Sequence, residues 1–204
     1  MGEFEELIEF TNGFAFKSTE LLDNYEDDCY CVFKMGNIKK GGGLKYDGTK
    51  SFFKKENAQN LKKYILKRGD LLMCMTDMKD NVALLGHTAL MNEDDKFIVN
   101  QRVGLLRPKN EFSIDYPYLY LLTNFPKFIE ELRSKANRGV QVNLSTSEIK
   151  NIHVIIPPKS INQLFDNTIK PVFNKIFSNI EQIQTLTQIR DTLLPKLMSG
   201  QLEI

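Results

Sequence analysis

The feature that most constrains the fold of this chain is a repeating apolar pattern in its C-terminal part. One row repeats every seven residues and contains Ile169, Ile176, Ile183 and Leu197, with Arg190 breaking it. A second row is offset by three residues and contains Val172, Leu186 and Leu193. This spacing is typical of a coiled-coil seam, and it predicts a long helix that packs against another helix. Three further apolar residues widen the stripe beyond a strict two-stranded seam: Phe173, Ile180 and Leu194.

Capping and proline residues in the sequence predict where this helix begins and where it is interrupted. Ser160 and Gln163 follow Pro157-Pro158 in the spacing of a capping box, so we expect the helix to start there. Pro171 removes a helical hydrogen bond, which predicts a kink or a restart that leaves a second segment of about 23 residues, roughly 35 Å long. Two interpretations of the apolar stripe stay open. It can pair with a second helix, or it can fold back on its own domain.

The remainder of the chain predicts one α+β domain. Residues 1–157 contain several short apolar or alternating runs typical of strands in a mixed, curled β-sheet, at 29–35, 71–75, 82–91, 98–106 and 152–156. The segment 116–136 is predicted to be helical, with Asp115-Tyr116-Pro117 as its start and Pro126 dividing it into two short pieces. We therefore expect a globular domain at 1–157, followed by a long coiled-coil helix at 158–204.

The net charge of +1 hides a segregation of charge along the chain. Residues 1–28 hold nine acidic and one basic side chain, whereas residues 34–68 hold eleven basic and two acidic ones. The second block is a candidate surface for a polyanion, although lysine-rich loops are often merely solvated. If the partner is DNA, the lysines expected to contact its phosphates are Lys39, Lys40, Lys45, Lys50, Lys54 and Lys55.

The sequence carries no recognisable catalytic or metal-binding motif. Its three cysteines have neither the count nor the spacing of a disulfide framework or a zinc site. Gly41-Gly42-Gly43 is not followed by the Lys-Ser/Thr of a phosphate-binding loop, and Asp77, Lys79 and Asp80 are interpreted as loop polarity. An acidic N-terminus and the lack of a long apolar run favour a soluble cytoplasmic protein rather than a secreted or membrane-bound one.

Planar amide and guanidinium groups are the side chains best suited to read base edges, because they form two hydrogen bonds at once. The candidates for this role are Asn37, Arg138, Gln141 and Asn143, the last two in a loop predicted at 139–143. Gln101 and Arg102 have the same chemistry, but a structural role within their strand region is favoured for them.

Several short motifs, in order, resemble the specificity subunit of type I restriction-modification systems. They are Asn12-Gly13 with Phe16 and Ser18, Met35-Gly36-Asn37-Ile38, Leu66-Lys67-Arg68-Gly69-Asp70-Leu71-Leu72, Asn100-Gln101-Arg102-Val103, Gln141-Val142-Asn143-Leu144-Ser145, and Leu193-Leu194-Pro195-Lys196-Leu197-Met198-Ser199-Gly200. They span nearly the whole chain. Members of the family usually carry two target-recognition domains and two helical regions, whereas this sequence shows one of each.

The resemblance implies a non-catalytic subunit that recognises double-stranded DNA. It implies modification subunits that use S-adenosylmethionine, and restriction subunits that use ATP and Mg; no cofactor or metal is expected in this chain. With one recognition domain, such a chain would work as a homodimer through the C-terminal helix or beside a second half-subunit, and the homodimer would read a bipartite target. The expected interface residues are Ile169, Val172, Ile176, Ile180, Ile183, Leu186 and Leu193. The alternative is a truncated or silent specificity cassette that dimerises without productive DNA recognition.

Overall fold

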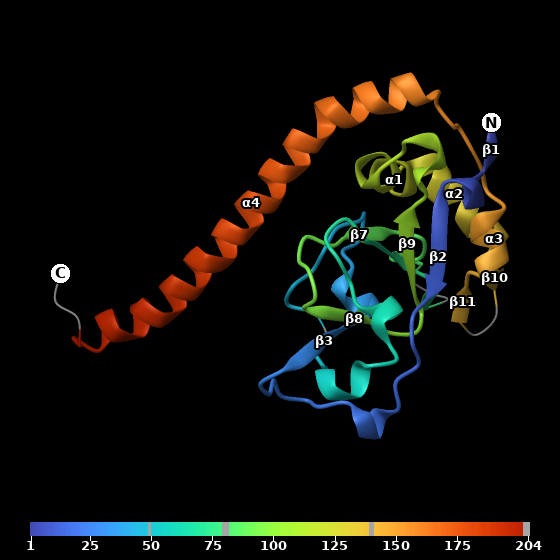
Figure 1. The fold of residues 1–204 in the computed structure, drawn as a ribbon. Helices are drawn as coiled ribbons and strands as arrows, with labels where there is room; N and C mark the ends of the chain where they lie inside the picture. The colour runs from blue at the N-terminus through green and yellow to red at the C-terminus, as the bar shows by residue number, and fades with distance from the viewer. Residues whose placement is uncertain (49, 79–81, 139–140, 202–204) are drawn as a thin grey trace.

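The computed structural model describes residues 1–48, 50–78, 82–138 and 141–201 and shows an α+β domain from which one long helix projects (Figure 1). The strands are β1 (Gly2–Glu3), β2 (Ile8–Asn12), β3 (Cys29–Phe33), β4 (Phe52–Lys54), β5 (Leu71–Cys74), β6 (Thr76–Met78), β7 (Thr88–Leu90), β8 (Phe97–Val99), β9 (Val103–Pro108), β10 (Asn137–Arg138), β11 (Gln141–Asn143) and β12 (His153–Val154). The α-helices are α1 (Tyr116–Thr123), α2 (Pro126–Lys135), α3 (Thr146–Lys150) and α4 (Lys159–Met198). The predicted fold class is confirmed.

The strands form four small sheets rather than one curled sheet. Their orders are β1-β12, β10-β11-β6, β2-β9-β5-β7 and β4-β3-β8. Of the pairings between these strands, β3 with β8 is parallel and the others are antiparallel. The segment predicted as one strand at 98–106 is two, because the chain turns at Arg102, whose φ is +70°.

The position of strand β5 between two cores explains why its sequence is continuously apolar. Leu71 and Met73 face a core shared with α1, α2 and α4, whereas Leu72 and Cys74 face a second core under β8. Both faces of the strand are therefore buried, and no position is left for a polar residue. A third cluster, centred on Phe16, Phe53 and Ile98, fills the space beside β3, β4 and β8.

The predicted start and the predicted break of the helical segment at 116–136 are both confirmed. Asp115 is the N-cap of α1, and its Oδ1 accepts a hydrogen bond from Tyr116 N at 2.7 Å. Pro126 begins α2, so the two helices are separate, as expected. Among the described helices, none is long and apolar enough to cross a membrane.

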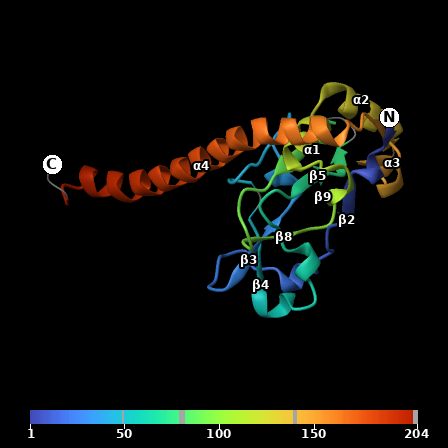
Figure 2. The ribbon, with the colours of Figure 1, turned by 45° about the horizontal axis from the view of Figure 1, so that its top comes forward.

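Two expectations for the long helix need correction. The helix begins at Lys159 with Pro158 as its N-cap, so Ser160 lies inside the first turn and cannot serve as the cap. Pro171 does not restart the helix, because α4 is continuous over 40 residues, about 60 Å at 1.5 Å per residue. It bends over α1 and then leaves the domain (Figures 1 and 2). Pro171 is solvent-exposed, so the carbonyl that loses its partner can be hydrated.

A buried ion pair links β9 to the turn before β5. Arg107 donates from Nε and Nη2 to the two carboxylate oxygens of Asp70, both at 2.7 Å, and Nη2 also donates to Ile65 O at 3.1 Å. Asp70 Oδ2 also accepts from Lys67 N at 2.8 Å. The side chain of Asp70 is only 6% exposed, so the pair is shielded from water on the carboxylate side.

We predict that Asp70→Asn lowers the free energy of unfolding by about 2 kcal/mol, because the guanidinium loses its charged partner while half-buried. Urea denaturation measures this change. The matched control is Glu131→Gln, which removes an exposed ion pair with Lys135 on α2 and should cost less than about 0.5 kcal/mol. Equal losses in the two variants would contradict a structural role for the Asp70–Arg107 pair.

Candidate DNA-recognition surface and helix face

The basic segment folds into an excursion that we call the lysine loop, residues 34–51. At its base Lys34 Nζ donates to Ser51 Oγ at 2.7 Å, and further along Ile38 and Leu44 form an isolated antiparallel bridge. Its tip, Gly41-Gly42-Gly43, has φ values of +79°, +95° and +105°, a backbone conformation that glycine adopts without strain. The tip is fixed to the domain because Gly43 N donates to Thr88 O at 2.9 Å.

Asn37, predicted to read a base, instead holds this loop together. Its Oδ1 accepts from Lys34 N at 3.0 Å and its Nδ2 donates to Lys45 O at 3.3 Å. The side chain is 3% exposed. Both polar ends of the amide are therefore occupied inside the protein, which supports a structural role for Asn37; base reading by this residue stays a prediction.

The six predicted phosphate-contacting lysines fall into two groups. Lys39, Lys40, Lys45 and Lys50 are exposed on the lysine loop. Lys54 and Lys55 instead pair with the acidic N-terminal block, at 3.4 Å to Glu26 and 3.1 Å to Asp28. The charge segregation along the sequence is thus partly cancelled in space, and the lysine loop carries most of the uncompensated charge.

The segment predicted as a loop at 139–143 contains strand β11, which pairs with β10 and β6. Val142 is buried, whereas Gln141 is half-buried and Asn143 is exposed on either side of it. Asn143 Oδ1 accepts from Thr76 Oγ1 at 2.9 Å, which orients its amide. The backbone of Arg138 pairs with Val142, and residues 139–140 lie outside the described residues.

These candidate residues do not gather in one patch. In Figure 1, β10 and β11 lie on the opposite side of β9 from β3 and β8. The lysine loop instead borders α4, where Lys39, Leu44 and Tyr46 line the same groove as residues of the helix. A ligand that contacts both regions must therefore extend across the domain, as a DNA duplex does.

Other polar residues noted in the sequence have structural partners. Asp77 accepts backbone hydrogen bonds from Met78, Leu84 and Leu85 at 2.6–3.1 Å, so it holds the chain between β6 and β7. The other two polar residues of this loop, Lys79 and Asp80, lie outside the described residues. Burial is the main cause that lowers the pKa of His87, whose ring contacts Asn124. Burial likewise raises the pKa of Tyr46 to about 12, and its hydroxyl bonds to Asn92.

The N-terminal half of α4 packs against the domain. Phe173 and Phe177 are 7% and 2% exposed, and both rings contact Tyr116 of α1, with centroids 5.9 and 6.2 Å apart. Lys170 Nζ lies 2.6 Å from Asp115 Oδ2. Arg68 stacks on Phe177 at 4.7 Å and pairs with Glu181 at 3.7 Å. The N-terminal half of α4 therefore follows one of the two interpretations left open by the sequence, because it packs on the chain's own domain.

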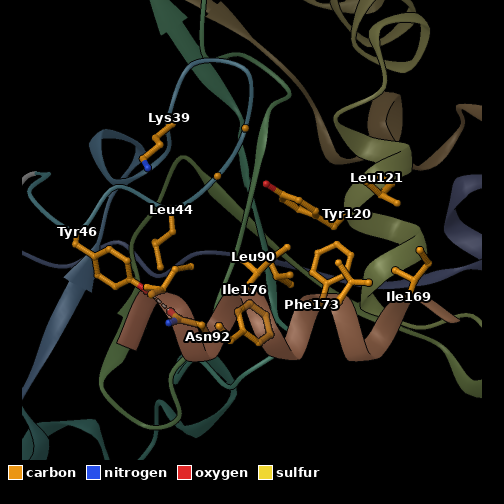
Figure 3. A pocket seen from close by; sticks show the side chains of 15 residues that line it. Lys39, Leu44, Tyr46, Leu90, Asn92, Tyr120, Leu121, Ile169, Phe173 and Ile176 are labelled. Atoms are coloured by element: carbon orange, nitrogen blue, oxygen red, sulfur yellow. Dashed lines mark hydrogen bonds between the residues drawn. The ribbon is translucent and has the colours of Figure 1, made fainter. Parts of the chain in front are cut away.

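The predicted seam lies on a neighbouring face of α4 and is mostly exposed. Val172, Ile176, Ile183, Leu186 and Leu193 are 40–64% exposed. Ile169 and Ile180 are half-buried at the edge of an apolar groove of about 500 Å³ between α4 and the domain. Figure 3 shows this groove, with Leu44, Tyr46, Leu90 and Tyr120 across from the helix.

The comparisons with known proteins agree with this architecture. The family of the type I restriction modification DNA specificity domain matches residues 1–189. The chain belongs to this family. The match covers the globular domain and most of α4, and it confirms the resemblance inferred from the motifs.

Individual specificity proteins show how much of the chain is shared. The specificity subunit of the type I restriction enzyme HindI from Haemophilus influenzae is 30% identical over 142 residues, which are 69% of this chain and 28% of that protein. The MjaIX specificity subunit from Methanocaldococcus jannaschii is 38% identical over 87 residues, 43% of this chain and 20% of that protein. The matches thus span less than a third of these curated relatives.

Solved structures from type I restriction-modification systems share the fold at low identity. The crystal structure of the type I restriction-modification S subunit from M. genitalium has a TM-score of 0.60 and 18% identity, covering 97% of this chain and 45% of that one. A chain from a structural study of type I R-M complex assembly and conformational transition has a TM-score of 0.54 and 14% identity, covering 94% and 42%.

The face of α4 that binds the chain's own domain is not apparent from the apolar stripe in the sequence. The apolar stripe predicts that Phe173 extends the surface for a partner, yet this residue is buried against α1. A usable signal exists in the sequence, because Phe173 and Phe177 are four residues apart, as are Asp166 and Lys170. Residues at this spacing share one side of a helix, distinct from the seam.

We predict that Phe177→Ala lowers the free energy of unfolding by about 3 kcal/mol, because the buried ring leaves a cavity between α4 and α1. Ile183→Ala on the exposed seam is the control and should cost less than about 0.5 kcal/mol in dilute protein. Thermal or urea unfolding followed by circular dichroism measures both. A loss for Phe177→Ala no larger than that for Ile183→Ala would contradict the docking of α4.

Proposed function

We propose that this chain is the non-catalytic DNA-recognition subunit of a type I restriction-modification complex, which directs adenine methylation and DNA cleavage by partner subunits. The match of the specificity family across the globular domain and most of α4 carries this proposal. In the complex, modification subunits would use S-adenosylmethionine, and restriction subunits would use ATP and Mg. The chain itself would supply binding energy and sequence discrimination.

Residues 1–157 would form the target-recognition domain. The lysine loop supports phosphate binding, because Lys39, Lys40, Lys45 and Lys50 project ammonium groups from a backbone that is fixed at both its base and its tip. Such contacts give affinity without sequence preference. Lys54 and Lys55 would contribute less, since carboxylates already accompany them.

We assign base reading to the small sheet β10-β11-β6, in which β11 is the central strand. Gln141 and Asn143 carry planar amides that can bond adenine through two hydrogen bonds, and Arg138 carries the group suited to guanine. Asn143 is held by Thr76 and by the carbonyl of Gln141, so its amide is oriented before DNA arrives. Unlike Asn37 it is exposed, and its amide keeps one N–H and one lone pair for a base. Discrimination would then come from β11 and affinity from the lysine loop.

Residues 158–204 would join two recognition domains. The proposed interface uses the exposed seam with its two half-buried flanking residues: Ile169, Val172, Ile176, Ile180, Ile183, Leu186 and Leu193. Two identical copies related by a two-fold axis would each read the same half-site, so the target would be a bipartite inverted repeat with an unread spacer.

The experiment that tests this function is co-expression of the chain with the modification subunit of its own system in a methylation-free host. Single-molecule mapping of N6-methyladenine across the genome then reveals the target. A bipartite inverted repeat is the expected result. An asymmetric motif would replace the homodimer with a second, different recognition half. A functional modification subunit that leaves no methylated motif would overturn the proposal in favour of a silent cassette that dimerises without reading DNA.

We predict that replacing Lys40, Lys45 and Lys50 by Gln weakens binding to a short DNA duplex and flattens its salt dependence. The slope of log K against log salt should fall by roughly 0.9 for each phosphate that the variant no longer neutralises. Fluorescence anisotropy at several KCl concentrations measures this slope.

Two controls accompany the lysine variants. Lys127→Gln on α2 changes net charge away from the lysine loop and should leave the slope unchanged. The pair Lys54→Gln and Lys55→Gln should reduce the slope less per residue than the loop variants, because both lysines already pair with acids. An unchanged slope in the triple loop variant would remove the lysine loop from the DNA surface.

A further inference from the structure

Two polar residues interrupt the exposed seam of α4. Arg190 occupies a position in the seven-residue row, and Asn179 occupies one in the offset row. At 3.6 residues per turn both project from the same side of the helix as Ile176 and Ile183, and both are exposed. In a paired helix each would face the partner, where an unmatched polar group opposite an apolar one is costly.

In one antiparallel register of two α4 helices, the two polar residues of the seam face each other across the interface. When Ile183 faces Leu186 of a second copy, Ile176 faces its Leu193 and Val172 faces its Leu197. In the same register Asn179 faces Arg190 of the second copy, and Arg190 faces its Asn179. A shift of one heptad in either direction sets Arg190 opposite Val172 or Leu186, and so breaks every polar match.

A parallel pairing lacks this complementarity. Equivalent positions then face one another, so Arg190 meets Arg190 of the second copy and their like charges repel. In the antiparallel register each guanidinium, with five N–H donors, meets an amide oxygen that accepts. Within one chain Arg190 Nε donates to Asp191 Oδ1 at 2.8 Å, and Nη2 lies 2.7 Å from the same oxygen, which leaves other N–H groups for the partner.

We propose that Arg190 and Asn179 of a second copy form a polar layer that sets the antiparallel register of α4 self-pairing. This inference rests on the proposed function, since it specifies how two recognition domains are joined. A polar layer inside an apolar seam selects one register because every other register leaves it unsatisfied.

The same register gives the apolar groove an occupant. Leu193 and Leu197 of the second copy lie opposite Ile176 and Val172, which line the groove between α4 and the domain. The distal end of one helix is then covered partly by the partner's recognition domain and partly by its helix. The register also places Lys175 near Lys196 of the second copy, but this contact is at the exposed rim, where salt screens the repulsion.

The test changes the charge at position 179 in the full chain and measures the dimer dissociation constant by sedimentation equilibrium at physiological ionic strength. Asn179→Asp places a carboxylate against Arg190 in both symmetric layers, and dimerisation should tighten about fivefold or more. Asn179→Arg places two guanidinium groups together and should weaken it about tenfold or more. The control is Asn174→Asp, exposed on another side of α4, which should have little effect.

The outcomes separate the register from self-pairing itself. A parallel dimer would be weakened by Asn179→Asp, because two new carboxylates would face one another. A dimer that responds equally to Asn179→Asp and Asn174→Asp would overturn the polar layer while leaving self-pairing and DNA recognition intact. A monomer at all concentrations would overturn self-pairing and point to a different chain as occupant of the seam. Circular dichroism confirms that each variant is folded.

A second measurement tests the register by disulfide formation in a Cys31→Ser background. Mixing the Ile176→Cys chain with the Leu193→Cys chain should give a cross-linked heterodimer on mild oxidation. Mixing Ile176→Cys with Leu186→Cys probes a register shifted by one heptad and should give little product. The reverse preference would overturn the proposed register.

Discussion

The contact of Phe173 and Phe177 with helix α1 determines how α4 is oriented relative to the globular domain. These two rings, four residues apart, lie against Tyr116 and hold α4 on the domain. Because an α-helix is stiff over this length, fixing its N-terminal half also fixes the direction of its free end. The globular domain and the distal part of α4 are thereby held in one geometry.

Docking on the domain and the proposed pairing with a second copy use two different sides of α4. The docking side carries Phe173, Phe177 and the charged contacts of Lys170 and Glu181, whereas the seam carries aliphatic residues at coiled-coil spacing. The two interpretations left open by the sequence, folding back and pairing, are therefore compatible. The groove where these sides meet is where a partner helix would contact both α4 and the domain.

Local signals in the sequence predict local structure well. Features that depend on contacts between residues distant in sequence could not be predicted. The caps and breaks at Asp115 and Pro126 depend on neighbouring residues, so they could be predicted. The pairing of Lys54 with Glu26 brings together residues 28 positions apart, which no local pattern reveals. Asn37 has the chemistry of a base reader, but only the folded loop shows that its amide is already used. Strand β11 was missed because its three residues gain stability from β6, far away in sequence.

The length of the seam also limits the spacing between the two DNA half-sites that two copies could read. From Val172 to Leu197 the helix rises about 38 Å at 1.5 Å per residue, and in the proposed register this stretch is shared by both copies. The two recognition domains would then sit at opposite ends of a rod close in length to one turn of DNA, about 34–36 Å. Half-sites about one turn apart present the same groove to both domains, so a rigid helix of this length favours two sites on one face of the duplex. A register shift of one heptad would change the separation by about 10 Å and move the half-sites off that face, which is why a polar layer that fixes the register matters for recognition.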